Sequence, residues 1–232
     1  ITCDEPWVRE RRLQGLSLRD VAVSLYNARG DRLTRQHGDL LFTHFGVSGP
    51  AGLRLGHYVS TGLLRNEGPL RLAVDFKPEL NEEQVLADVR ALAADNPKKA
   101  LKNVLSPYLP ERMVPLLLEQ SDLDPDTTFA HLPKGPLREL ARRIKAFGAR
   151  VTGTLSIEEA FVTGGGVNTD EVDARTMASQ RMPGLYFSGE ILDVHAHTGG
   201  YNITIAFSSG HAAGRAAAKA AKALDAQDAT CP

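Results

Sequence analysis

The sequence has little of what would mark a disulfide-rich, membrane-spanning or nucleic-acid-binding protein. Its 232 residues include two cysteines, Cys3 and Cys231, which stand near opposite ends and in no metal-type pair. We therefore expect reduced thiols and a cytoplasmic location. There is no apolar run of the roughly 20 residues that a membrane span requires, and we expect no signal peptide, because no basic stretch followed by an apolar stretch is visible at the start. A formal net charge of -1 gives no electrostatic reason to expect nucleic acid as a partner.

The length is sufficient for one large domain or two modest ones. Alternating apolar and polar residues and turn residues predict strands over 21–26, 32–36, 39–45, 70–76, 151–157 and 159–163. Between them, helical spacing predicts a short helix from Pro50, capped by Ser48 or Gly49, with Leu53, Leu55 and Val59 partly lining one face. It also predicts a helix capped by Asn81, and further helices at about 98–105, 111–120 and 136–147. A helical block thus interrupts a β-structure.

The final third carries the most chemical information. Leu185-Tyr186-Phe187-Ser188 is typical of a short buried strand that ends at Gly189, with Glu190 directly after it. Ligands of α/β sheets bind at the carboxyl ends of strands, so the Glu190 carboxylate is placed to meet ligand hydroxyls. The alternative is an ordinary solvated glutamate in a loop.

A glycine pair, Gly199-Gly200, precedes Tyr201-Asn202 and a helix with a face of small residues. Glycines let a ligand approach the backbone closely, and a helix start offers unpaired N–H groups and partial positive charge. These features suit a phosphate or the electron-rich edge of a flavin, and physical reasoning alone does not distinguish the two ligands. A helix packed tightly for stability alone is the other interpretation.

The segments Gly189-Glu190 and Gly199-Gly200-Tyr201-Asn202 resemble the C-terminal FAD signature of flavoproteins with two dinucleotide-binding regions. A closer resemblance, over nearly the whole chain, is to a bacterial family of NAD(P)/FAD-dependent oxidoreductases, also described as aminoacetone-oxidase-like flavoproteins. The segments 38–50, 162–167 and 183–187 carry it, in that order and with a helical block between the first two.

This resemblance implies a split FAD domain with an insert between its halves. Residues 1–160 would be an α+β insert, a β-barrel-like sheet with a helical block at about 81–148. Residues 161–232 would be the C-terminal part of the α/β FAD-binding domain. The family's G-x-G-x-x-G loop for the FAD pyrophosphate is absent, and Gly164-Gly165-Gly166 does not replace it. Because the chain also opens with Ile1, we expect a fragment whose partner is the N-terminal half of that domain.

Five further residues are candidates for the site. His44, at the end of an expected strand, could serve as an acid or base, although a lone histidine more often shapes a turn. His195 and His197 would share a strand face, but without a third ligand we expect no metal site. The resemblance places Asp193 near the flavin, where it either contacts the cofactor or caps a loop. Tyr201 either stacks near the flavin or anchors the helix start.

The sequence therefore predicts a portion of an FAD-dependent oxidoreductase that exchanges hydride with a small organic substrate, with NAD(P)H or oxygen as the second partner. The candidate cofactor-binding residues are Gly189, Glu190, Asp193, Gly199, Gly200, Tyr201 and Asn202. We expect the chain by itself to be inactive. One alternative is a non-catalytic binding module without flavin, and another is a phosphate-ligand protein that uses the same helix start.

Overall fold

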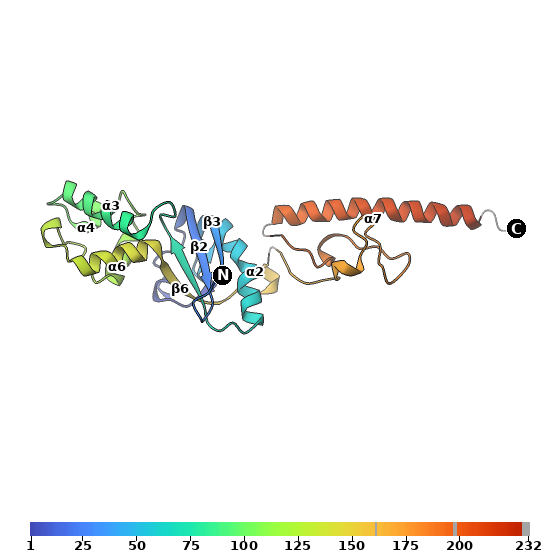
Figure 1. Ribbon diagram of the computed structural model, residues 1–232, viewed down its shortest axis with the longest axis horizontal. Coiled ribbons are helices and arrows are strands. Elements are labelled where there is room, and N and C mark those ends of the chain that lie inside the picture. Colours follow the sequence, from blue (N-terminus) through green and yellow to red (C-terminus); the bar gives the residue numbers. More distant parts are fainter. Residues whose placement is uncertain (161, 197–198, 229–232) are drawn as a thin grey trace. The chain divides into compact units, whose positions relative to one another are not determined.

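The computed structural model describes residues 1–160, 162–196 and 199–228. The chain divides into two compact units, Ile1–Leu155 and Ser156–Pro232 (Figure 1). Within the described residues, no helix combines the length and the apolar character that a membrane crossing requires. The assignment of 1–160 to an insert and 161–232 to an FAD domain remains a prediction.

The first unit is built on a six-stranded antiparallel sheet. Its strands, in the order in which they lie side by side, are β1 (Thr2–Cys3), β6 (Phe147–Gly153), β5 (Leu70–Asp75), β2 (Ser17–Tyr26), β3 (Arg32–Phe42) and β4 (Val47–Ser48). The two edge strands meet, because the Cys3 N–H donates to the Phe45 carbonyl at 2.8 Å and the Val47 N–H donates to the Ile1 carbonyl at 3.0 Å. The sheet is therefore a nearly closed barrel.

Gly46 makes this closure possible. Its φ is +146°, and a Cβ there would lie 2.4 Å from the Ile1 carbonyl oxygen. Only a residue without a side chain lets the two edges approach this closely. Cys3, next to the seam, is buried, and burial raises the pKa of its thiol to about 12, so that the thiol is protonated at neutral pH.

The first unit also contains two separate helices and a helical block. The separate helices are α1 (Pro6–Arg9) and α2 (Gly49–Leu64). The block consists of α3 (Glu82–Asp95), α4 (Leu101–Leu105), α5 (Val114–Gln120), the 3-10 turn η1 (Phe129–His131) and α6 (Lys134–Lys145). The block connects β5 to β6, so it is an insertion between two neighbouring strands (Figure 1). The expected cap at Asn81 is present as a capping box with Gln84.

One continuous apolar core joins the barrel to the helical block. In the barrel, the rings of Trp7, Phe42 and Phe147 pack against each other with centroid distances of 5.3 to 6.2 Å. Buried residues alternate with more exposed ones along β5 and β6, so every second side chain of these strands packs into this core.

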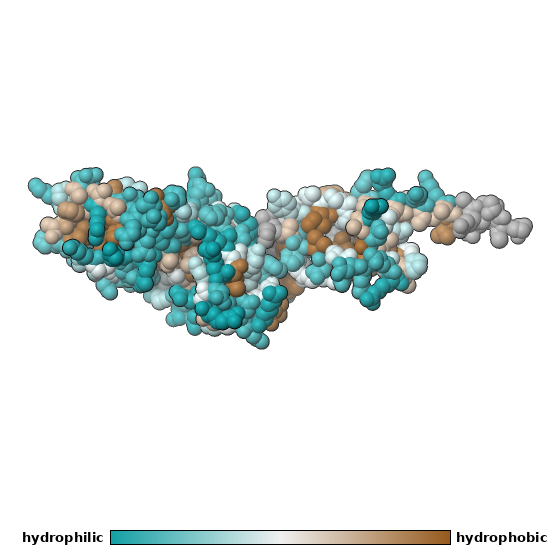
Figure 2. Space-filling view, viewed as in Figure 1, coloured by the Kyte–Doolittle hydropathy of each residue, from teal (hydrophilic) through white to brown (hydrophobic). Residues whose placement is uncertain are grey.

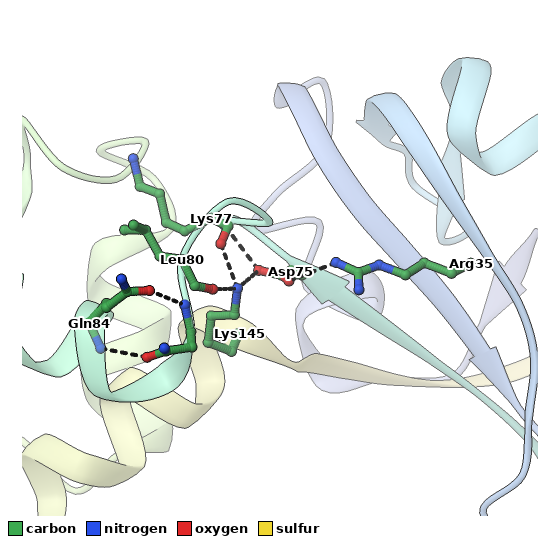
Figure 3. A network of polar contacts seen from close by, with 7 residues as sticks. Arg35, Asp75, Lys77, Leu80, Gln84 and Lys145 are labelled. Atoms are coloured by element: carbon green, nitrogen blue, oxygen red, sulfur yellow. Dashed lines mark hydrogen bonds and ion pairs between the residues drawn. The ribbon is translucent and has the colours of Figure 1, made fainter.

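A polar network fixes the junction of the barrel and the block (Figure 3). Lys145, at the end of α6, donates to the carbonyls of Lys77 and Leu80 and forms an ion pair with Asp75 at 2.8 Å. Asp75 ends β5 and also pairs with Arg35 of β3 at 3.3 Å. The Lys145 and Asp75 side chains are each only 15% exposed, so the pair is shielded from most solvent.

The second unit has little regular structure apart from one long helix. It contains the 3-10 turns η2 (Ile157–Glu159), η3 (Thr169–Glu171) and η4 (Gly189–Ile191), and the helix α7 (Gly199–Asp228). The loops lie along the first part of α7 (Figure 1). Large apolar side chains remain exposed in this unit, among them Ile191, Ile203 and Phe207. Figure 2 shows hydrophobic residues at its surface.

The predicted α+β fold, a barrel-like sheet with a helical block, is confirmed, whereas several boundaries were wrong. The segments 32–36 and 39–45 form one strand, β3, in which Gly38 has a φ of +141°. The helix at Pro50, expected to be short, runs for 16 residues; Leu55 and Val59 on it are buried, whereas Leu53 is 47% exposed. The strand expected over 151–157 ends at Gly153. The one expected over 159–163 is not found at its described residues, and residue 161 lies outside them.

Candidate functional site

The turn that carries Glu190 does not follow a strand, so that expectation was wrong. Residues 185–188 form no strand, Tyr186 makes only an isolated bridge with Ala178, and Leu185 is 39% exposed. Glu190 lies instead in η4, which begins at Gly189 with a φ of +75°. Backbone hydrogen bonds join residues 185–187 to residues 177–179, and the Gly189 N–H that follows is bonded to α7.

Ser209 of α7 provides the contact that holds the turn. Its hydroxyl accepts from the Gly189 N–H at 2.9 Å and donates to the Ile205 carbonyl at 2.7 Å. Ser209 is 7% exposed. Sequence reasoning missed this residue, because a serine within a helix gives no signal that its hydroxyl will bond to a distant turn.

Two acidic side chains of the turn bind the glycine-rich segment 163–167. Glu190 Oε1 accepts from the Thr163 N–H at 3.0 Å and from the Thr163 hydroxyl at 2.9 Å. These bonds lower the pKa of the exposed Glu190 carboxyl, the backbone N–H more than the hydroxyl. Asp193 Oδ1 accepts from the Gly165 N–H at 3.2 Å. Asp193 thus caps a loop, which is one of the two roles considered for it.

The two segments also join through their backbones. The Val167 N–H donates to the Ile191 carbonyl at 2.8 Å, and the Asp193 N–H donates to the Val167 carbonyl at 2.9 Å. A Cβ at Gly166 would lie 2.3 Å from the Ile191 carbonyl oxygen. The run of three glycines is therefore explained in part by a close backbone approach.

The start of α7 lies beside this turn. Gly199 and Gly200 belong to the first turn of the helix itself rather than preceding it. The Asn202 side chain accepts from the Ala196 N–H at 3.1 Å and donates to the Ala196 carbonyl at 3.0 Å, so it holds the preceding loop. The first N–H groups of a helix lack intrahelical acceptors and carry partial positive charge.

These features border a groove of about 310 Å³. Gly189, Glu190, Gly199 and Asn202, all predicted site residues, line it together with the apolar Val194, Ile203, Ile205 and Ala206. Asp193, Gly200 and Tyr201 are not among its lining residues. Tyr201 is 67% exposed, which does not fit the buried anchor considered for it. The apolar side of the groove was missed, although Ile203 and Ala206 are three residues apart on one helix.

His44 and His195 are not among the residues that line this groove. His44 is exposed in the bend before β4, with its ring edge to face with Phe45 at 5.1 Å, and its role as an acid or base remains a prediction. His195 lies near Gly164, and His197 falls outside the described residues. Among the residues that the structure describes, no group of three metal-ligating side chains comes together.

Comparison with known proteins gives several matches. The chain is 35% identical over 193 residues to the ribosomal RNA dihydrouridine synthase of Escherichia coli (strain K12), covering 83% of this chain and 45% of that protein. It is 35% identical over 176 residues to the Haemophilus influenzae protein of the same name, covering 76% and 41%. It is 31% identical over 187 residues to the 3-dehydro-bile acid delta(4,6)-reductase of Clostridium scindens, covering 81% and 46%.

The chain therefore spans less than half the length of these curated relatives. They are named as a synthase and a reductase, which supports an oxidoreductase-like enzyme family, and none of the three carries the expected name of an aminoacetone oxidase. The family model described as "HI0933-like protein barrel and H2TH domain" matches residues 1–162, which contain the barrel and the helical block. The chain belongs to this HI0933-like family.

Proposed function

We propose that this chain is part of a flavin-dependent oxidoreductase that exchanges hydride between FAD and a small organic substrate, with NAD(P)H as a possible co-substrate. The observation that carries the proposal is the groove that brings the Gly189–Glu190 turn together with the start of α7. Membership of an oxidoreductase-like family supports it.

The residues of the groove fit part of an FAD molecule. A carboxylate has about four acceptor positions, so Glu190 retains acceptor capacity for flavin hydroxyls beyond its two bonds to Thr163. A Cβ at Gly199 or at Gly200 would meet nothing within 4 Å, so the space beside the backbone at the start of α7 is open. Bound FAD would supply the hydride chemistry, while this chain would orient the cofactor and stabilise negative charge beside the helix start.

The rest of the cofactor would need residues that this sequence does not contain. It has no G-x-G-x-x-G motif for the pyrophosphate. Ile203 and Phe207, four residues apart on one face of α7, are 60% and 78% exposed. An apolar helix face of this kind requires a covering partner. We propose that this partner is the N-terminal half of the FAD domain, and that the complete enzyme acts in the cytoplasm.

The relatives' names do not define the substrate, because one name specifies ribosomal RNA and another a bile acid. We retain a small organic molecule as the proposed substrate. The alternatives of a non-catalytic binding module and of a phosphate-ligand protein are separated from the proposal by the following experiment.

The test is to purify the chain alone and the chain preceded by its upstream coding sequence, and to record the flavin absorbance of each. We expect FAD to copurify with the longer protein and NAD(P)H to reduce it. Glu190→Gln in the longer protein should weaken FAD binding by roughly tenfold, the loss of one charge-assisted hydrogen bond. Glu159→Gln, another exposed glutamate in a 3-10 turn, should have no effect. A longer protein that folds without flavin would contradict the proposal.

A further inference from the structure

A second groove lies within the helical block. It has a volume of about 510 Å³ and lies between α3, the η1 segment and α6. Ala91 and Ala94 line it from the exposed face of α3, and the buried Leu137 lines it from α6. Two alanines stand on an exposed helix face, where long polar side chains are usual, and so leave the groove open above the buried Leu137.

The other wall is an exposed apolar segment. Phe129 is 41% exposed and Leu132 is partly buried against the core. Apolar residues are visible at the surface of the helical block (Figure 2). The volume lies within the range of about 300 to 1,000 Å³ that is typical of sites for small molecules.

The charged residues that line the groove are both cationic. Arg90 of α3 and Lys134 of α6 both line it. In the part of the chain that the structure describes, neither has a carboxylate within 4.0 Å, whereas Arg138, one turn along α6 from Lys134, pairs with Glu83. Lys134 also stands at the start of α6, which has no side-chain cap and no acidic residue in its first turn. Cations are unfavourable at this end of a helix, so an anion here would relieve the repulsion.

We propose that this groove binds a small amphipathic anion, a carboxylate attached to an extended aliphatic body. Arg90 and Lys134 would hold the carboxylate, and the aliphatic body would lie against Phe129 and Leu137. Apolar surface makes up most of the lining, which favours such a molecule over an RNA backbone, for which positive and stacking groups would dominate. The site lies in the first unit and does not depend on the proposed flavin site.

The test uses three probes of known chemistry on the whole chain. Decanoate carries both parts of the proposed ligand, acetate only the carboxylate, and decanol only the aliphatic body. Binding is followed by the backbone amide NMR shifts of residues 90–94 and 129–137. We expect decanoate to bind at these amides at least roughly tenfold more tightly than either partial probe.

Three variants locate the site. The double substitution Arg90→Gln and Lys134→Gln should weaken decanoate binding by roughly tenfold or more, and Ala94→Leu should block the groove without changing its charge. Lys99→Gln, on an exposed lysine outside the groove, should leave binding unchanged. Equal binding of decanoate and decanol, shifts confined to other regions, or no effect of the first two variants would overturn the proposal. So would a short RNA that shifts these amides while decanoate does not.

Discussion

The two units of this chain are stabilised by different kinds of interaction. Among the described residues, all but three of the buried apolar side chains belong to Ile1–Leu155, and the three exceptions are Val172, Leu192 and Ala213. The first unit therefore has a core of its own. The second is held mainly by hydrogen bonds between loops and by the contact of η4 with α7. Because hydrogen bonds add only about 1 kcal/mol each to stability, the second unit should depend on a partner.

Hydrogen exchange should show the largest difference between the units. Amides of the barrel strands β2 and β5 should open only with global unfolding, at about 5–15 kcal/mol. Amides of the loops 162–196 should exchange with an opening free energy near zero. Mass spectrometry of exchanged peptides measures both in one sample. Equal protection of the loops and the strands would show that the second unit is stable by itself.

Two phenylalanine substitutions, one in each unit, should differ in their effect on the free energy of unfolding. Phe147 is 1% exposed and packs against Trp7 and Phe42, whereas Phe207 is 78% exposed on α7. Phe147→Ala should lower the free energy of unfolding by about 3–5 kcal/mol because it leaves a cavity. Phe207→Ala should change it by less than about 0.5 kcal/mol. Urea denaturation measures both effects, followed by the fluorescence of Trp7 for the first unit and by the circular dichroism of the helices for the second. A large effect of Phe207→Ala would mean that its face is already covered.

Within the first unit, Lys145 tests whether the barrel and the helical block are joined by polar contacts as well as by the core. Lys145→Met removes the bonds to Lys77 and Leu80 and leaves Asp75 with Arg35. We expect a loss of about 1–3 kcal/mol in the free energy of unfolding, since partly buried acceptors lose their donor. Lys99→Met, on an exposed lysine, is the control. Equal effects of the two variants would show that the network is not stabilising.

The smallest expected effect concerns Glu190 in the second unit. The pKa of its carboxyl should lie below the ordinary value for a glutamate, because the Thr163 N–H and hydroxyl stabilise the charged form. A lowered pKa in the folded state means that this contact stabilises the turn fully above the ordinary pKa and is lost as the pH falls through the folded pKa. Thr163→Ala should raise the pKa only part of the way, since the N–H remains. NMR titration of the side-chain carboxyl measures this, and an unshifted pKa would show that the turn is not held.

Prediction from sequence worked where the pattern is local. The helix at Asn81 was identified from its cap and its apolar spacing, and the strand over Leu70–Asp75 from its alternation. It failed at Leu185–Ser188, where an apolar run forms no strand because no described neighbour pairs with it beyond one bridge. It also failed to place Gly46 at the barrel seam, since that role depends on a strand more than forty residues away.

For the site, the sequence indicated Gly189, Glu190, Gly199 and Asn202, which line one groove. The contacts of Glu190 with Thr163 and of Gly189 with Ser209 were not foreseen. Both join residues 20 or more positions apart, and no periodicity in a sequence encodes such a pairing. Only the described structure shows that the carboxylate of Glu190 also stabilises the fold, through its hydrogen bonds to Thr163.

The sequence by itself determined the helical block that follows the strand at Leu70, the capping of α3 and the small-residue character of α7, because these depend on residues within a few positions of each other. The tertiary structure alone decided that the sheet closes on itself, that Lys145 joins α6 to the end of β5, and that an acidic turn holds the glycine segment. These contacts arise when distant segments bury apolar surface together, and the energy of that burial is not visible in any single stretch of chain.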